Sequence, residues 1–267
     1  KIQPGKIVSE TENTVFGYKE LKLSNGATVI LKKTDFKDDE VQMQAFSKGG
    51  KSMFGAADYT NLKVFDQAIG ISGLGNFSSN ELQKAMAGKE CNADASLGNT
   101  RQYMTAHSTP KDLETMMQMQ YLYFTHINKD EKQYQNLLTA LDMTLKNKSL
   151  NPDAVFSDSL AATMYAHNPR FTQIDVQDLK DINYDRILEM AKDRFKNAGQ
   201  FTFVFVGNFD EQTLRPLIEQ YVASLPATGD KEEEFNEIQT LFKGEVINGS
   251  DGMVCRNALH AGQHGED

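Results

Sequence analysis

The sequence predicts an α+β fold, a largely antiparallel sheet of about six strands with helices packed on one face. Three observations predict it. Alternating apolar and polar segments near 21–31 and 90–107 are typical of hairpin-linked strands, segments with helical spacing follow each pair, and a short apolar run spans 201–206. The pattern occupies residues 19–226, which we take as one domain.

The first strands flank the dipeptide Asn25-Gly26, which tolerates the positive φ of a tight turn between the apolar segments of 21–31. A third strand follows at 41–47, where apolar and small residues alternate with glutamines. Residues 56–69 have the apolar spacing of a helix. The chain therefore opens with three strands and a helix.

The second half predicts two strands at 90–97 and 100–107, followed by several helices. One helix begins at Asn151-Pro152, and we expect its Phe156, Leu160 and Met164 to face inward. The run 201–206 is apolar on both faces, which suits a buried strand. Asp210 then caps the last helix.

The two ends lack such patterns. Residues 1–18 predict a linker or extended N-terminal segment. Residues 227–267 predict a linker, with the charge run of 230–234, and an unpatterned tail that is the truncated start of a following domain.

Charge and hydropathy exclude some function classes. The 267-residue chain has 37 acidic and 28 basic residues and a formal net charge of −9, which disfavours nucleic-acid binding. Its longest apolar run is far shorter than the ~20 residues of a membrane span.

Metal-ligand and nucleophile patterns are weak. His107, His126 and His167 have no second ligand at helical spacing, and Cys91 has no neighbouring base. His260 and His264 are four residues apart, but Gln263 stands where a zinc peptidase helix would carry a glutamate base. We expect no catalytic residue and no metal ligand in this chain.

Several segments, in this order, resemble the insulinase/pitrilysin family of zinc peptidases, which includes mitochondrial processing peptidase. The matching pieces are Leu23-Ser24-Asn25-Gly26-Ala27-Thr28-Val29, Phe46-Ser47-Lys48-Gly49-Gly50, Phe77-Ser78 through Leu82, Thr100-x-x-Tyr103, and Val206-Gly207-Asn208-Phe209-Asp210 with Leu225-Pro226. The resemblance covers residues 19–226, one complete family domain.

Active domains of this family carry His-x-x-Glu-His on the helix after the third strand. Here Asp58 stands where the first histidine would be, Asn61 where the glutamate would be and Leu62 where the second histidine would be. Leu62 has no ligand atom and Asn61 cannot act as a base. The resemblance thus implies a non-catalytic domain from the C-terminal half, with zinc in the catalytic half of the parent protein.

The resemblance also implies partners. The catalytic half, in the same or a partner chain, would bind extended peptides, and this domain would help to enclose them in a clamshell chamber. By strand alternation Asn92, Asp94 and Ser96 face solvent and are candidates for the chamber wall. The alternative is a structural subunit like the non-proteolytic core subunits of respiratory complexes. For bacterial relatives the resemblance implies the periplasm or cell envelope.

Overall fold

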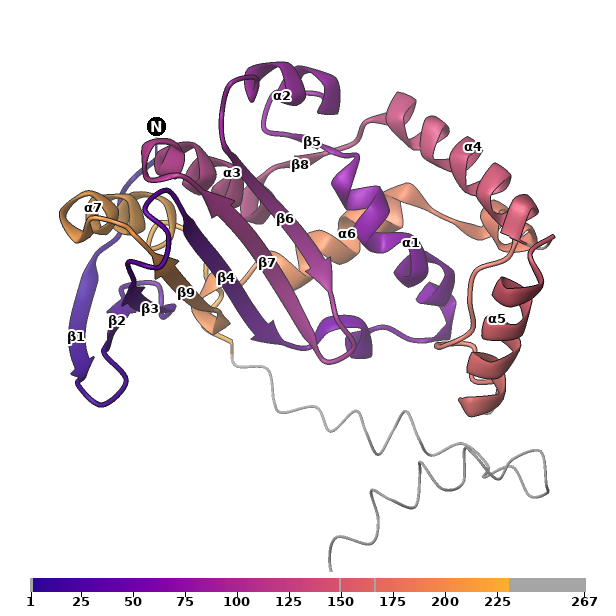
Figure 1. Ribbon diagram of the computed structural model, residues 1–267, viewed down its shortest axis with the longest axis horizontal. Helices are drawn as coiled ribbons and strands as arrows, with labels where there is room; N and C mark the ends of the chain where they lie inside the picture. The colour runs from indigo at the N-terminus through magenta and orange to yellow at the C-terminus, as the bar shows by residue number, and fades with distance from the viewer. Residues whose placement is uncertain (1, 149, 166, 231–267) are drawn as a thin grey trace, which may run out of the picture.

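The computed structural model describes residues 2–148, 150–165 and 167–230 (Figure 1). Its strands are β1 (Ile7–Asn13), β2 (Tyr18–Leu23), β3 (Thr28–Lys33), β4 (Val41–Lys48), β5 (Gly73–Leu74), β6 (Cys91–Leu97), β7 (Arg101–Ser108), β8 (Ile127–Asn128) and β9 (Thr202–Gly207). Its α-helices are α1 (Tyr59–Gly70), α2 (Ser79–Ala85), α3 (Leu113–Thr125), α4 (Glu131–Lys148), α5 (Pro152–Met164), α6 (Tyr184–Phe195) and α7 (Glu211–Tyr221). Short 3₁₀ turns include η2 (Ala56–Asp58) and η5 (Ala198–Gln200).

The main sheet has the order β1-β2-β3-β9-β4-β7-β6 within the described residues. Its neighbours are antiparallel except β3 and β9, which run parallel. The predicted α+β class with a largely antiparallel sheet is confirmed. The sheet has seven strands rather than about six, because residues 7–13 of the expected N-terminal linker form β1 at its edge.

The predicted turn at Asn25-Gly26 joins β2 to β3. Gly26 has φ +91°, a conformation that L side chains rarely adopt, and its N–H donates to the carbonyl of Leu23. Asn25 accepts from the N–H of Ala27 and donates from its amide to the carbonyls of Val222 and Leu225. The turn therefore also fastens the chain that follows α7.

One face of the sheet is covered by helices. α1 and α3 pack on β6, and α3 also contacts β7, α6 and α7. A cluster of aromatic rings joins these layers at the start of β9, where Phe124 of α3 meets Phe195, Phe201 and Phe203 with ring centroids 4.9–5.8 Å apart. Burial of these side chains supplies the hydrophobic free energy that holds helices and sheet together.

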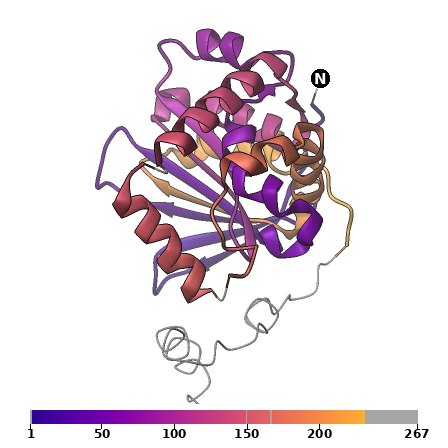
Figure 2. The ribbon, with the colours of Figure 1, turned by 90° about the vertical axis from the view of Figure 1, so that its right-hand side faces the viewer.

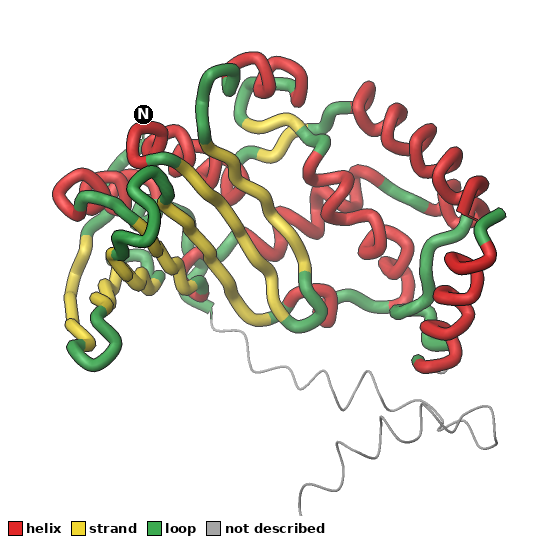
Figure 3. The backbone as a smooth tube through the Cα atoms, viewed as in Figure 1, coloured by secondary structure: helices red, strands yellow, loops and turns green. Residues whose placement is uncertain are grey.

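The other face of the sheet is turned toward the viewer in Figure 1, and the described helices leave it open. In Figure 3 the strands β4, β7 and β6 cross this face with no helix in front of them. Along β4 the residues of this face, from Gln42 to Lys48, alternate with buried residues from Val41 to Ser47. We call this surface the open face.

Helices α4 and α5 lie beyond the β6 edge of the sheet, and Figure 2 brings them in front of the strands. The expectation that Phe156, Leu160 and Met164 face inward is wrong. They are 68%, 44% and 38% exposed, and α5 buries none of its residues. The spacing of apolar residues along a helix indicates which side would pack against another element. It does not say whether the fold places an element there.

Among the described residues, every helix is too short or too polar to cross a membrane. His260, His264 and the tail from 231 onward lie outside the described residues.

Candidate functional site

The start of α1 holds Asp58, Asn61 and Leu62, the three residues that the sequence comparison above aligns with the metal motif of the family. Asp58 occupies the N-cap position of α1, but its side chain caps no backbone N–H there. Instead its two carboxylate oxygens accept hydrogen bonds from Nε and Nη2 of Arg186 on α6, each 2.9 Å long. This pairing with the Arg186 guanidinium lowers the pKa of Asp58 below its ordinary value of 3.8.

Asn61 and Leu62 are buried one turn further along the helix. The Oδ1 atom of Asn61 accepts from the backbone N–H of Asn183, at 2.8 Å. Asn183 is itself the N-cap of α6, where its side chain accepts from the N–H of Arg186. Leu62 is 4% exposed and belongs to the hydrophobic core. Together these contacts fasten the start of α1 to the start of α6.

These residues do not fit a zinc ion. Zinc in proteins takes three or four nitrogen, oxygen or sulfur ligands at about 2 Å. Leu62 has no donor atom, the Asn61 oxygen is occupied by Asn183, and the Asp58 carboxylate is engaged by Arg186. We therefore interpret the motif position as a polar clamp between two helices. That this chain binds no zinc stays a prediction.

The partners of this clamp were missed in the sequence. Asn183 and Arg186 follow Asp58 by more than 120 residues, and the fold alone brings α6 against α1. The only local signal is the Asn183 side chain, because asparagine is a favoured N-cap residue.

The predicted wall residues Asn92, Asp94 and Ser96 do lie on the open face. They alternate along β6 with Ala93, Ala95 and Leu97, which are buried toward the helices. Across the strand pair they lie opposite His107, Thr105 and Tyr103 of β7. Their place on the sheet is as alternation predicts, whereas their role in a chamber wall is a proposal.

A pocket of about 430 Å³ on this face includes Asn92 and Asp94 but not Ser96. Its other lining residues come from β4, β7 and β9: Gln42, Met43, Gln44, Thr105, Ala106, His107, Val204 and Val206. Val204 and Val206 are only half-buried, so the expected fully buried strand at 201–206 is buried on its helix face alone. The pocket thus combines an apolar floor with hydrogen-bonding side chains.

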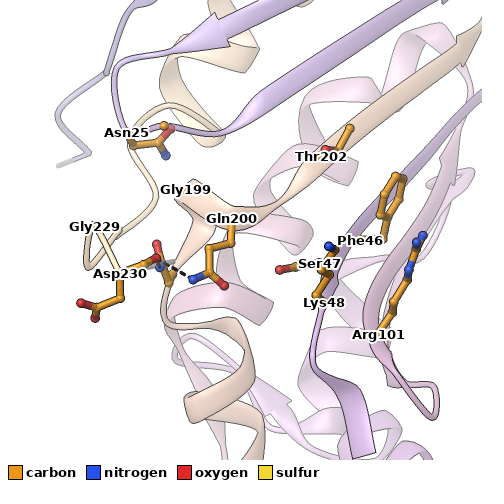
Figure 4. A pocket seen from close by; sticks show the side chains of 12 residues that line it. Asn25, Phe46, Ser47, Lys48, Arg101, Gly199, Gln200, Thr202, Gly229 and Asp230 are labelled. Atoms are coloured by element: carbon orange, nitrogen blue, oxygen red, sulfur yellow. Dashed lines mark hydrogen bonds between the residues drawn. The ribbon is translucent and has the colours of Figure 1, made fainter. Parts of the chain in front are cut away.

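A second pocket of about 500 Å³ lies where β4 ends and β7 begins (Figure 4). Phe46, Lys48 and Arg101 line one side, and the turn at Gly199 and Gln200 lines the other. Asn25, Asn197 and the segment Gly229–Asp230 complete it. Sequence inspection missed this pocket because its residues come from five separate parts of the chain.

Comparisons with known proteins agree with the resemblance to zinc peptidases seen in the sequence. Residues 181–260 match the model of the peptidase M16 inactive domain. A zinc protease PQQL-like protein from Arabidopsis thaliana is 27% identical over 237 residues, which cover 88% of this chain and 22% of that protein. The probable zinc protease PqqL of Escherichia coli strain K12 is 25% identical over 83% of this chain and 24% of its own length. The chain thus spans about a quarter of the length of these relatives.

Solved structures share the fold. The periplasmic protease PqqL from Escherichia coli superposes with a TM-score of 0.73 at 24% identity, over 88% of this chain and 26% of that one. A protease from Helicobacter pylori superposes with a TM-score of 0.65 at 12% identity, over 82% of this chain and 53% of that one. The family match and the zinc-protease relatives confirm the resemblance found in the sequence: the chain is similar to M16, or insulinase-family, zinc proteases, and its residues 181–260 match the M16 inactive domain.

Proposed function

We propose that this chain is a non-catalytic domain of a zinc metalloendopeptidase and helps to enclose extended peptide substrates in a clamshell chamber. The observation that carries the proposal is the clamp at the start of α1, in a chain whose residues 181–260 match the M16 inactive domain. By the proposed alignment, the Asp58–Arg186 ion pair and the buried Leu62 take the place of the metal ligands of an active domain. The hydrolytic zinc would then be held by a catalytic half, in the same polypeptide or in a partner subunit.

The open face is the surface that would line the chamber. It carries mixed polar and half-buried apolar side chains over a broad area, including Asn92, Asp94 and Ser96 on its edge strand. Such a surface can hold a peptide in place by many weak contacts without contributing a reactive group. Its benefit to catalysis would be positioning and restriction of substrate size.

The experiment uses the assembled enzyme, with this domain and its catalytic half, and a quenched fluorescent peptide as substrate. Replacing Asn92 and Asp94 together by lysine should raise KM several-fold with little change in kcat, because the change alters substrate contacts and leaves the metal untouched. Asn136→Lys with Asp153→Lys, at exposed positions on α4 and α5, makes the same two kinds of substitution and is the matched control.

Two results would contradict the proposal. The first is an unchanged KM in the wall variant, with zinc content and folding equal to wild type. The second is hydrolysis of the same peptide by this chain alone, after separation from any catalytic half by gel filtration. If the assembled protein cleaves no peptide at all, the structural-subunit alternative is favoured instead.

A further inference from the structure

The turn between β2 and β3 holds a reactive dipeptide. In an Asn-Gly pair the backbone nitrogen of the glycine can attack the side-chain carbonyl carbon of the asparagine, because glycine has no Cβ to hinder the approach. The chain has two such pairs, Asn25-Gly26 and Asn248-Gly249, and the second lies outside the described residues. The first is accessible to water, because Gly26 is exposed and Asn25 lines the pocket of about 500 Å³ (Figure 4).

Hydrogen bonds hold this dipeptide in a closed, unreactive arrangement. The Gly26 N–H, which must lose its proton before the nitrogen can attack, donates to the carbonyl of Leu23 at 2.9 Å. The side-chain nitrogen of Asn25, which would leave in the reaction, donates to the carbonyls of Val222 and Leu225 at 2.8 and 3.1 Å. Its Oδ1 atom accepts a further hydrogen bond within the turn. The attacking nitrogen, the leaving nitrogen and the carbonyl oxygen are therefore all engaged.

Two of these hydrogen bonds depend on a segment that is distant in sequence. Val222 and Leu225 follow α7, and both are core residues that are 0% and 2% exposed. The Asn25 side chain is released when the segment 222–226 leaves its place or when the whole domain unfolds. The burial of this segment, rather than the turn itself, therefore sets how often the asparagine is free to react.

We propose that Asn25 is a latent deamidation site, which the native fold protects and which local opening of residues 222–226 exposes. In the reaction the backbone nitrogen of Gly26 forms a bond to Cγ of Asn25, and the side-chain nitrogen leaves as ammonia. Water then adds to the resulting succinimide ring and opens it to aspartate or isoaspartate. Water is the only co-reactant that this chemistry needs.

The product cannot rebuild the closed turn. A carboxylate has no N–H to donate, and in this place it would face the carbonyl oxygens of Val222 and Leu225, which are also acceptors. Each modified molecule therefore keeps the segment after α7 loosened, so that a transient opening becomes a permanent one. The inference does not rest on the proposed function, because it concerns this chain alone.

The test follows deamidation of the 267-residue chain at mildly alkaline pH by peptide mapping and mass spectrometry, which separates Asn25 from Asn248. A synthetic peptide of residues 20–30 is the unprotected reference. We expect Asn25 to react about ten- to a thousandfold more slowly in the folded chain than in the peptide, the factor expected of two or three hydrogen bonds that must open first. Hydrogen exchange of residues 222–226 should be faster in the deamidated fraction than in the unmodified fraction.

The decisive variant is Leu225→Ala, which keeps the dipeptide and removes part of the buried anchor of the segment. It should speed deamidation of Asn25 by about tenfold or more, because truncating a buried leucine loosens its surroundings by at least that factor. The matched control is Leu145→Ala on α4, where the leucine is 9% exposed, and it should leave the rate unchanged. Thermal melts check folding, and Val222→Ala takes the place of Leu225→Ala if that variant does not fold.

The inference is overturned if Asn25 reacts as fast in the folded chain as in the peptide. It is also overturned if the control variant speeds the reaction as much as Leu225→Ala, because the reaction would then pass through unfolding of the whole domain. Equal hydrogen exchange of residues 222–226 in the deamidated and unmodified fractions would contradict the claim that the product keeps this segment loosened.

Discussion

The ion pair between Asp58 and Arg186 should stabilise the fold, and its free energy can be measured by a double-mutant cycle. The single variants are Asp58→Asn and Arg186→Met, and the double variant combines them. Arg186 also contacts Glu189 at 3.2 Å. The cycle removes that second contact from the result, because it isolates the energy shared by the two mutated residues.

The structure sets the expected magnitude. The pair is bidentate, the Asp58 side chain is 13% exposed and that of Arg186 is 41% exposed. A fully exposed ion pair contributes about 0.2–1 kcal/mol, whereas breaking a fully buried one costs about 3–5 kcal/mol. For this half-exposed pair we expect a coupling free energy of about 1–2 kcal/mol. Each single variant should then lower Tm by roughly 2–6 °C.

The coupling should depend on pH. The pairing lowers the pKa of Asp58 in the folded protein below its ordinary value of 3.8, so protonation favours the unfolded chain. The contribution is therefore fully present above the ordinary pKa and is lost as pH falls through the lower, folded pKa. Asp58→Asn should accordingly lose less stability on acidification than wild type.

Urea unfolding followed by circular dichroism, from neutral pH down to about pH 3, measures both effects. Asp35→Asn, in the exposed loop between β3 and β4, is the control and should follow wild type. A coupling below about 0.3 kcal/mol at neutral pH, within the error of additivity, would refute the clamp as a stabilising contact.

Two further predictions concern polar side chains elsewhere. Gln120 on α3 is fully buried, and its amide atoms have no hydrogen-bond partner among the described residues, so Gln120→Leu should raise the free energy of unfolding by about 1–2 kcal/mol. Gln118→Leu, which loses a bond to Tyr221, should not, and equal effects in urea unfolding would contradict this reasoning. Asn25→Asp removes the amide donor to two backbone carbonyls after α7, so hydrogen exchange of residues 222–226 should accelerate; unchanged protection would show that the turn does not fasten this segment.

Much of the fold follows from local patterns. Three features can each be recognised from a few consecutive residues: the Asn25-Gly26 turn, the alternation along β4 and β6, and the helix cap at Asp210. β1 does not, because its residues 7–13 are mostly exposed and lack apolar alternation. It is held by pairing with β2 and by the Glu10–Arg215 ion pair with α7, neither of which is visible locally.

In helix α5 a local pattern was present but the burial that it predicted was not. Its Phe156, Leu160 and Met164 are spaced four residues apart along one side of the helix, yet Phe156 is 68% exposed. Periodicity specifies a face but not its partner. The same limit applies to the candidate site. Alternation could place Asn92 and Asp94 on one face, whereas only the folded register brings Lys48 opposite Arg101 and α6 against Asp58.

The central claim is that the start of α1 supplies a helix clamp in place of a catalytic metal centre. Metal analysis of the gel-filtered 267-residue chain, purified in the presence of zinc, tests it most directly. We expect a zinc-to-protein ratio near zero. A ratio of about one would contradict the claim, and most plainly if it persisted when His260 and His264 were replaced and disappeared in Asp58→Asn.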